Sequence, residues 1–334
     1  LSAPINAYSA DYIKVDIIYR PTKVTPVNSP KSYTDKLTAY GYDETFDRFP
    51  IAQVFETVAT GEKFSVIANH FKSKGCTDAT GEDLDTGQGC WNAKRVAQAK
   101  ALLDFVELIQ EYAQDPDVIL VGDYNAYGAE APINTLTGAG MINEMLRVPA
   151  ATRYTYVYDG MAGYIDQMIA TSSFDSQITG IAPWHINSDE ATMLDYTLSY
   201  KPAAQLALFS VDPYRTSDHD PILIGISPNT GPSASNIIID TQPAYPGKSF
   251  FMELPDGLFL DPTLNEVLTY SATLVNGDPL PAWLTFNPEN RTLLGTPPQS
   301  NEGQSLSIKI SVTDHAGATA SQTFLQNLWC QTFA

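Results

Sequence analysis

Basic residues are scarce in this chain. Lys and Arg total 19 against 38 Asp and Glu, which gives a formal net charge of -19 at pH 7. So acidic a surface repels nucleic acid at long range, and a polyanionic substrate then needs a local basic patch or a divalent cation. The charge balance therefore argues against a non-enzymatic nucleic-acid binder, but it leaves a metal-dependent nuclease open.

Long apolar runs are also lacking. No stretch approaches the roughly 20 apolar residues that a transmembrane helix needs, so no transmembrane segment is expected. A hydrophobic content of 43% with 17% charged residues is typical of a globular protein. A length of 334 residues exceeds one average domain and allows a sizeable core.

Cysteine is limited to Cys76, Cys90 and Cys330. The first two bracket a loop rich in Gly and Asp that has too few apolar residues to hold itself by packing. A disulfide across this loop would contribute about 3 kcal/mol. Zinc is the competing use, but it fits poorly without a nearby Cys/His pair. We expect the disulfide, an oxidising extracellular or periplasmic setting, and an odd Cys330. The start at Leu1 indicates a mature, processed or partial chain.

Four stretches carry the residues with catalytic potential. They are Asn69–Lys74, Gly122–Asn125, Tyr164–Gln167 and Thr216–Pro221. The last places Asp218 beside His219 just before an apolar run, so a carboxylate and an imidazole adjoin at the mouth of a strand. Hydrolysis of a phosphate ester needs a group that holds a metal and a group that moves a proton, and such a pair supplies both.

The first two thirds of the chain predict mixed α/β structure. Alternating or wholly apolar runs predict strands, and the strand ranges are 12–19, 51–57, 63–69, 117–121, 154–158, 163–170 and 222–226. The ranges 154–158 and 163–170 are expected to pair with each other through a turn at Asp159-Gly160. Helical periodicity over 91–112 places Val96, Ala99, Leu103, Val106 and Ile109 on one face, and a short helix is expected over 132–139. The range 175–210 is irregular.

The last third changes character. Residues 229–236 have the Gly-, Pro- and Ser-rich composition of a linker. After them no helical periodicity is present, and short strands are predicted at 237–239, 250–252, 268–274 and 306–312. We therefore expect two domains, 1–230 and 231–334, the second an all-β sandwich.

The four stretches, in this order, resemble the endonuclease/exonuclease/phosphatase superfamily, and most closely its bacterial extracellular nucleases related to pancreatic deoxyribonuclease. The run Asn69–Cys76 and the later Gly87–Asn92 are particularly similar to that secreted branch. The resemblance covers roughly 10–228 and implies a four-layer α/β/β/α sandwich. It also implies two earlier strands with a metal-binding Glu, which are missing here. Glu44 and Glu56 lie in the wrong order and context to replace that Glu.

The resemblance implies roles for the later motifs in the attack of water on a phosphodiester. Asp218 would hold Mg²⁺ or Mn²⁺, with Asp123 as a second candidate ligand. Asp123 would also orient the water or accept its proton, and Asn125 would donate a hydrogen bond to the phosphate. His219 would act as the base or would hydrogen-bond the phosphate as its charge grows.

The resemblance also implies that His70 protonates the leaving oxygen and that Asp166 pairs with His70, which would fix its tautomer and raise its pKa. Two basic residues, Arg20 and Lys72, are candidates for substrate binding together with Lys74. The alternative, that these cations are only solvated, stays open.

The second domain resembles a cadherin-like, immunoglobulin-type module of bacterial surface proteins. The resemblance rests on Pro281–Leu284, on Gly295–Pro297 and on the strand that ends at Asp314. Ca²⁺ binding through Asp314 or Glu253 is one interpretation, and acids on a spacer domain are the other. This module implies contact with a cell surface or extracellular matrix.

These observations predict a secreted, metal-dependent extracellular nuclease that hydrolyses DNA, with RNA as a further candidate substrate. A phosphomonoesterase or lipid phosphodiesterase of the same superfamily is the first alternative. A catalytically inactive surface or adhesion protein is the second.

Overall fold

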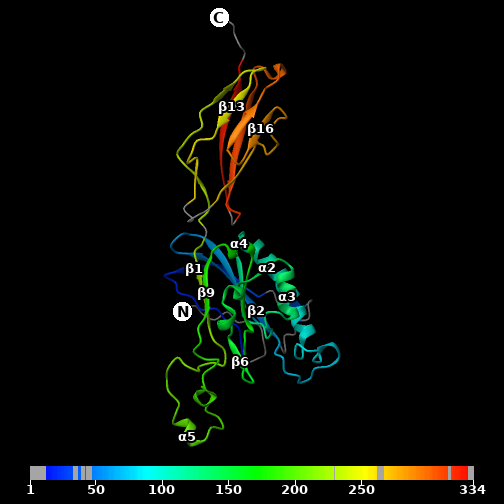
Figure 1. Cartoon of the computed structure of the whole chain (residues 1–334), viewed down its shortest axis with the longest axis vertical. Helices are drawn as coiled ribbons and strands as arrows, with labels where there is room; N and C mark the ends of the chain where they lie inside the picture. The colour runs from blue at the N-terminus through cyan, green and yellow to red at the C-terminus, as the bar shows by residue number, and fades with distance from the viewer. Residues whose placement is uncertain are drawn as a thin grey trace. The chain divides into compact units, whose positions relative to one another are not determined.

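The protein comprises two compact units, Leu1–Pro228 and Asn229–Ala334 (Figure 1). The computed structural model describes residues 13–32, 37–38, 42, 47–228, 230–261, 267–314 and 317–329. Residue 12 of the first predicted strand, Glu44 and Cys330 lie outside the described residues. The predicted fold class is confirmed, since a mixed α/β unit precedes a unit built from strands.

A six-stranded sheet forms the centre of the first unit, in the order β1-β2-β3-β4-β8-β5. Its strands are β1 (Val24–Lys31), β2 (Arg48–Thr57), β3 (Lys63–His70), β4 (Val118–Asp123), β5 (Ile142–Asn143) and β8 (Asp166–Ala170). β3 and β4 are parallel, and the other neighbours are antiparallel. The strands β3 and β4 are parallel because the chain between them crosses over through a helix.

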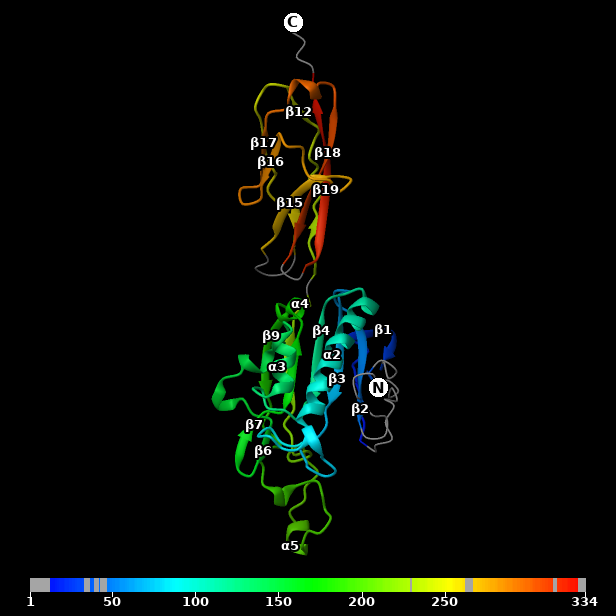
Figure 2. The ribbon, with the colours of Figure 1, turned by 90° about the vertical axis from the view of Figure 1, so that its right-hand side faces the viewer.

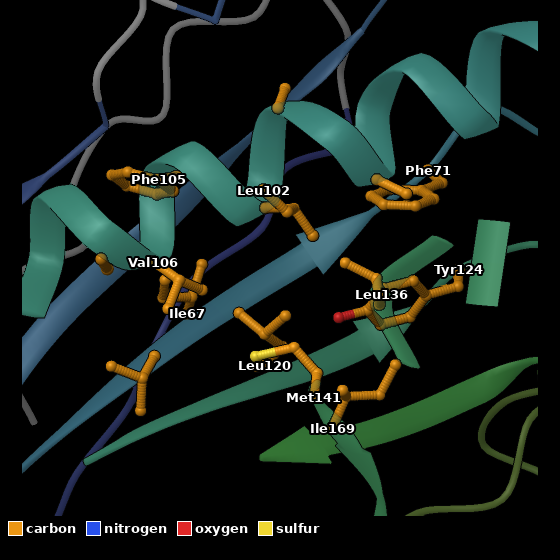
Figure 3. Close-up of a cluster of buried hydrophobic side chains, with 14 of the residues drawn as sticks. Ile67, Phe71, Leu102, Phe105, Val106, Leu120, Tyr124, Leu136, Met141 and Ile169 are labelled. Atoms are coloured by element: carbon orange, nitrogen blue, oxygen red, sulfur yellow. The ribbon is translucent and has the colours of Figure 1, made fainter. Parts of the chain in front are cut away.

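The helices α2 (Asn92–Ala113) and α3 (Ala131–Gly138) lie on one face of this sheet (Figure 2). Leu102, Phe105 and Val106 of α2 pack on Ile67 and Leu120 of the strands (Figure 3). The predicted helix is confirmed, but its buried face runs through 95, 98–99, 101–102, 105–106 and 109. Val96 and Leu103 lie at the margin of that face and are half-buried.

The opposite face of the main sheet is covered by a two-stranded sheet, β9 (Ile178–Pro183) with β10 (Ile222–Ile226). Ile178, Ile224 and Ile226 of this small sheet pack around Phe55 and Phe64 of the main sheet. Helices, main sheet and small sheet make three layers in the described residues. The outer face of the small sheet is open there, since Leu223 is 55% exposed.

Three expectations for the secondary structure of the first unit fail. Residues 13–20 form no strand, although Ile17 and Tyr19 pack on the core and Asp16 and Ile18 are exposed. The alternation of apolar and polar residues correctly indicates which side chains are buried. It contains no information on whether a neighbouring strand is there to pair with.

The ranges 154–158 and 163–170 do not form one hairpin. Instead β6 (Tyr156–Tyr158) pairs with β7 (Met161–Gly163), and β8 belongs to the main sheet. The range 175–210 contains β9, which was not predicted.

In its described residues the second unit contains three sheets. Their strands are β11 (Ser233–Ala234), β12 (Gln242–Ala244), β13 (Phe250–Glu253), β14 (Phe259–Leu260), β15 (Thr269–Leu274), β16 (Leu284–Asn287), β17 (Thr292–Gly295), β18 (Ser305–Thr313) and β19 (Thr319–Leu328). Alternation along β18 buries Ile308, Ile310 and Val312 in a core with Leu293 and Phe324. The predicted strand at 237–239 is wrong, as those residues lie in no strand. In the described part of the chain no helix is long and apolar enough to cross a membrane.

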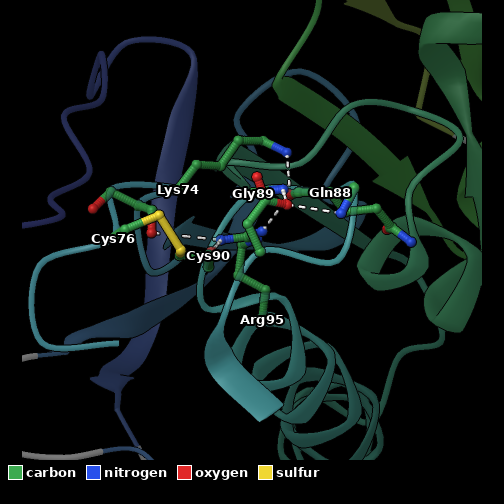
Figure 4. Close-up of a disulfide and its surroundings, with 9 residues drawn as sticks. Lys74, Cys76, Gln88, Gly89, Cys90 and Arg95 are labelled. Carbon is green, nitrogen blue, oxygen red and sulfur yellow. Dashed lines mark hydrogen bonds between the residues drawn. A yellow bond between two sulfur atoms is a disulfide. The ribbon is translucent and has the colours of Figure 1, made fainter. Parts of the chain in front are cut away.

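The disulfide Cys76–Cys90 is confirmed (Figure 4). Beside it, the fully buried Arg95 at the start of α2 donates to the carbonyl oxygens of Cys90 (2.7 Å) and Gln88 (2.9 Å). Lys74 donates to the same Gln88 carbonyl and pairs with Glu130 at 2.5 Å. The loop has few apolar side chains, so the covalent bond and these two cations hold it in place.

Candidate active site

Four polar residues form a row across one end of the main sheet. The strand registers pair Arg48 with His70, His70 with Asp123, and Asp123 with Asp166. The residues come from β2, β3, β4 and β8, which are adjacent in the sheet. Each lies where the apolar run of its strand begins or ends, so the hydrophobic pattern itself brings these side chains to one edge.

Gly122 permits the close approach of β3 and β4 beside this row. Its φ is +135°, and a Cβ there would lie 2.0 Å from the carbonyl oxygen of Asn69. Any other residue would push the two strand ends apart. Asn69 is buried and donates to the hydroxyl of Tyr124 (3.2 Å) and the carbonyl of Ile67 (3.0 Å). Asn69 therefore supports the strand end rather than facing solvent.

Asp123 is held by Asn125. The backbone N–H of Asn125 donates to Asp123 Oδ1 at 2.7 Å, and its side-chain Nδ2 donates to Asp123 Oδ2 at 3.2 Å. Nδ2 also donates to the carbonyl of Phe71 at 3.0 Å, so both amide hydrogens are used within the protein. The sequence predicted that Asn125 would donate to a phosphate. In this structure its amide hydrogens are used on the Asp123 carboxylate and the Phe71 carbonyl, and the contact with a phosphate stays a prediction.

His219 pairs with Asp166. The ring Nδ1 lies 2.8 Å from Asp166 Oδ2, although the two residues are 53 positions apart. The prediction that Asp166 pairs with His70 is therefore wrong. The reason is the strand order: β4 lies between β3 and β8, so Asp123 separates His70 from Asp166 by two inter-strand spacings of about 4.8 Å each.

The charge of His219 is set by its neighbours. Burial alone would lower the pKa of His219, but the hydrogen bond and the charge of Asp166, together with Asp123 and Asp218, raise it to about 9. Burial raises the pKa of Asp166, and the hydrogen bond from His219 opposes that rise. The imidazolium is thus favoured at neutral pH. Two roles were expected for His219, donor of a hydrogen bond to the phosphate and general base. The donor role fits better, because a protonated imidazole can donate a hydrogen bond but cannot accept a proton.

His70 contacts Arg48, which sequence reasoning missed. A guanidinium nitrogen of Arg48 makes a short hydrogen bond to His70 Nε2, and this ring nitrogen lies 3.3 Å from Asp123 Oδ2. A guanidinium can only donate, so Nε2 accepts, and in the neutral ring the proton resides on Nδ1. Arg48 could have been noticed in the sequence as a basic residue close ahead of the strand that precedes the His70 strand, since it proves to be the first residue of β2.

The other predicted site residues lie apart from the row. Asp218 is exposed, although it adjoins His219 in the chain. The Lys72 ammonium lies over the ring of Trp91, 4.9 Å from its centroid. Arg20 is exposed ahead of β1. Among the contacts of the described residues, none joins Arg20 or Lys72 to the row.

A second His–Asp pair, also missed, lies next to the His219 segment. Buried Asp220 accepts from the backbone N–H groups of Ile186, Asn187 and Ser188 (3.2, 2.9 and 2.9 Å) and contacts His185 Nδ1 at 2.9 Å. The Ser188 hydroxyl donates to it as well, at 2.5 Å. These bonds attach residues 185–188 to the segment that ends at Asp220.

The donor set suits a hard divalent cation. Asp123, Asp166 and His219 each offer one atom, and these atoms lie within 4.8 Å of one another. His219 and Asp166 are already paired with each other, so Asp123 is the carboxylate of this set that is left for a cation. Mg²⁺ and Mn²⁺ favour such oxygen ligands.

The second unit matches a known family. A family model described as "Putative Ig domain" matches residues 231–327. No curated protein matches the chain.

Several solved structures are similar to this chain. One is the human Nocturnin catalytic domain with bound sulfate, at 18% identity and a TM-score of 0.33, covering 47% of this chain and 50% of that chain. Another is a Bacteroides thetaiotaomicron protein described as endonuclease/exonuclease/phosphatase family (15%, TM-score 0.36, 50% and 57%). A third is D. rerio TDP2 with a single-strand DNA product (17%, TM-score 0.34, 61% and 68%). The chain thus spans about half the length of the first of these structures.

Proposed function

We propose that the first unit is a divalent-metal-dependent phosphodiesterase and that it hydrolyses nucleic acid. The observation that carries the proposal is the His219–Asp166 pair facing Asp123 at the end of the row. A cationic imidazole held by a buried carboxylate and a second carboxylate for water are the groups that phosphate-ester hydrolysis requires. Arg48 adds a fixed positive charge in a chain that is acidic overall.

In this proposal Asp123 orients the attacking water and accepts its proton. Its carboxylate is fixed by the backbone and side chain of Asn125, so little reorganisation is needed during the reaction. The His219 imidazolium donates a hydrogen bond to a phosphoryl oxygen as negative charge grows there. A Mg²⁺ or Mn²⁺ ion held by Asp123 and Asp218 would supply Lewis-acid polarisation of the phosphate.

His70 keeps the role of proton donor to the leaving 3′ oxygen. Only the imidazolium form can donate. Once it has given its Nε2 proton to the leaving oxygen, the neutral ring keeps its proton on Nδ1 and accepts from Arg48 at Nε2, as in this structure. Nucleic acid is proposed as the substrate because the motifs at residues 69–76 resemble those of the secreted nucleases. A phosphomonoester or a lipid phosphodiester would be cleaved by the same groups and is an outcome of the test below.

An extracellular location is part of the proposal. The disulfide Cys76–Cys90 needs an oxidising compartment to persist, and it is joined in one chain to a module that matches an immunoglobulin-type family. We assign to the second unit a spacing or attachment role at a cell surface or matrix. Asp314 accepts from the backbone N–H of Ala318 at 2.7 Å and is buried, so its contacts serve a turn of the protein.

The test is nicking of supercoiled plasmid by the full chain with Mg²⁺, Mn²⁺ or EDTA. Wild-type protein is expected to nick DNA only with metal, and His219→Ala is expected to lose this activity. His185→Ala is the matched control. It also removes an imidazole from a His–Asp pair, but Asp220 keeps four other donors and the row is untouched.

Bis-p-nitrophenyl phosphate, inositol phosphates and sphingomyelin form the parallel panel. Cleavage of a phosphomonoester or of sphingomyelin without nicking would replace the nuclease assignment and keep the site. No metal-dependent cleavage of any ester by folded protein would contradict the proposed function.

A further inference from the structure

The β6–β7 hairpin carries exposed apolar side chains next to the row. Tyr158 is 63% exposed and Met161 is 69% exposed, and they face each other as register partners. Figure 2 shows β6 and β7 as an arm at the edge of the first unit. The hairpin does not need these side chains for its own core, since neither of them is buried.

A line of rings connects this arm with the site. The Tyr156 ring lies 4.7 Å from the His219 ring, centroid to centroid, and the two residues also form a backbone bridge. Tyr156 and Tyr158 occupy the same face of β6 because alternate residues of a strand share a face. Their rings are stacked, 6.4 Å apart with an interplanar angle of 18°. The exposed end of the line is therefore Tyr158, two rings from the imidazolium.

The neighbouring surface continues this aromatic character. The ring of Tyr127 closes against Gly163 at the end of β7, where a Cβ would lie 2.5 Å from a ring carbon. The Lys74 ammonium lies 5.1 Å from the centre of the Tyr127 ring, but Glu130 neutralises this cation. The surface beside His219 thus offers aromatic faces and little unpaired positive charge.

Resting on the proposed function, we infer that Tyr158 is a specificity-determining residue that stacks on a nucleobase flanking the scissile phosphate. The occupant is a flat aromatic ring because the exposed end of a stacked pair offers a further ring face. Stacking on a tyrosine does not depend on base identity. A chain with a net charge of -19 attracts phosphates only weakly, so stacking would supply binding free energy that electrostatic attraction does not. The substrate class is accordingly a single-stranded or frayed nucleic acid, whose bases are free to leave their own stack.

The test compares two phosphodiesters that share the p-nitrophenyl leaving group. One is the p-nitrophenyl ester of thymidine 5′-monophosphate, and the other is methyl p-nitrophenyl phosphate, which has no base. Tyr158→Ala is expected to raise KM for the thymidine ester about tenfold, in line with the measured range for base–aromatic stacking. It is expected to leave kcat and all constants for the methyl ester unchanged, and Tyr158→Trp is expected to restore KM.

Tyr200→Ala is the matched control, since Tyr200 is fully exposed and lies in a different segment. Equal effects of Tyr158→Ala on both esters, or no effect on either, would overturn the inference.

Equilibrium binding separates this inference from the proposed function. The anisotropy of a labelled oligothymidylate is compared with that of an abasic strand of equal length, with the full chain in both cases. Tighter binding of the base-bearing strand, lost in Tyr158→Ala, supports stacking even if wild-type protein cleaves no ester. Equal binding of both strands by wild-type protein overturns it.

Discussion

Asp166 and His219 meet although the first belongs to the main sheet and the second to the segment before the small sheet, with Nδ1 and Oδ2 2.8 Å apart. The contact joins the two β layers at the proposed reaction centre. It also explains the charge of His219, because the hydrogen bond to a buried carboxylate and the negative charge around the ring outweigh the effect of burial on the imidazole pKa.

The substitution Asp166→Asn tests this pairing directly. The amide would keep the volume of the carboxyl group but not its charge, so the imidazolium would lose its partner and the orientation that goes with it. We expect kcat to fall by about 10² to 10⁴ on bis-p-nitrophenyl phosphate, with KM and melting temperature little changed. The exposed Glu107 provides the control variant Glu107→Gln. An Asp166→Asn protein with full kcat would refute the role of the pair.

Arg48→Met is expected to lower kcat/KM by about 10- to 100-fold. The substitution removes a charged hydrogen bond to His70 Nε2, and such bonds contribute about 1.5–3 kcal/mol. Arg48→Lys should recover part of the activity, because an ammonium can donate to the same nitrogen but lacks the planar fork. Steady-state kinetics on the same diester provide the measurement. Identical constants for Arg48→Met and wild type would remove Arg48 from the site.

Loss of the disulfide should destabilise the first unit. The bond closes a loop with a sequence separation of 14, for which the chain-entropy relation gives about 3 kcal/mol. The double variant Cys76→Ser/Cys90→Ser is expected to melt about 6–12 °C lower by scanning calorimetry. Cys330→Ser serves as the control for removal of a thiol. Equal melting temperatures for the double variant and wild type would show that Arg95 and Lys74 suffice to hold the loop.

Glu144 gives the stability a defined pH dependence. Its side chain is fully buried, and this burial raises its pKa to about 7 although Arg147 lies 2.7 Å away. The folded state therefore holds the proton more tightly than the unfolded chain. Its stabilising contribution is complete below about pH 4.5 and is lost as pH rises to about 7, at a cost of up to about 3 kcal/mol.

The measurement is urea unfolding of wild type and Glu144→Gln at pH 5, 6, 7 and 8. The free energy of unfolding of the variant should depend less on pH between 5 and 7, and Glu111→Gln, at an exposed position, should follow wild type. Parallel curves for wild type and Glu144→Gln would refute the assignment.

The sequence predicted the row better than it predicted the contacts within it. His70, Asp123 and Asp166 lie at the boundaries of apolar strands, and such boundaries can be read from hydrophobic patterns. Which carboxylate meets which histidine depends on strand order and on the packing of the second sheet, and local periodicity contains neither. Arg48 escaped notice for a related reason, since its register with His70 follows a bulge between Arg48 and Ile51.

The alternating residues 13–20 illustrate the same limit. Ile17 and Tyr19 are half-buried on one side, as the pattern predicts, yet hydrogen bonding to a neighbouring strand is a long-range property. The disulfide, by contrast, was predictable because a short loop without apolar content has few other means of being held.

The row of register partners also has a consequence for folding. Arg48, His70, Asp123 and Asp166 come from four strands, of which only β2 and β3 follow each other directly in the chain, so the site exists only when three separate pairings are in register. A slip of one residue in any of them would turn a side chain to the opposite face of the sheet. Recovery of activity during refolding should therefore lag behind the formation of α2 and coincide with amide protection in β3 and β4, which makes catalysis a probe of the last stage of sheet assembly.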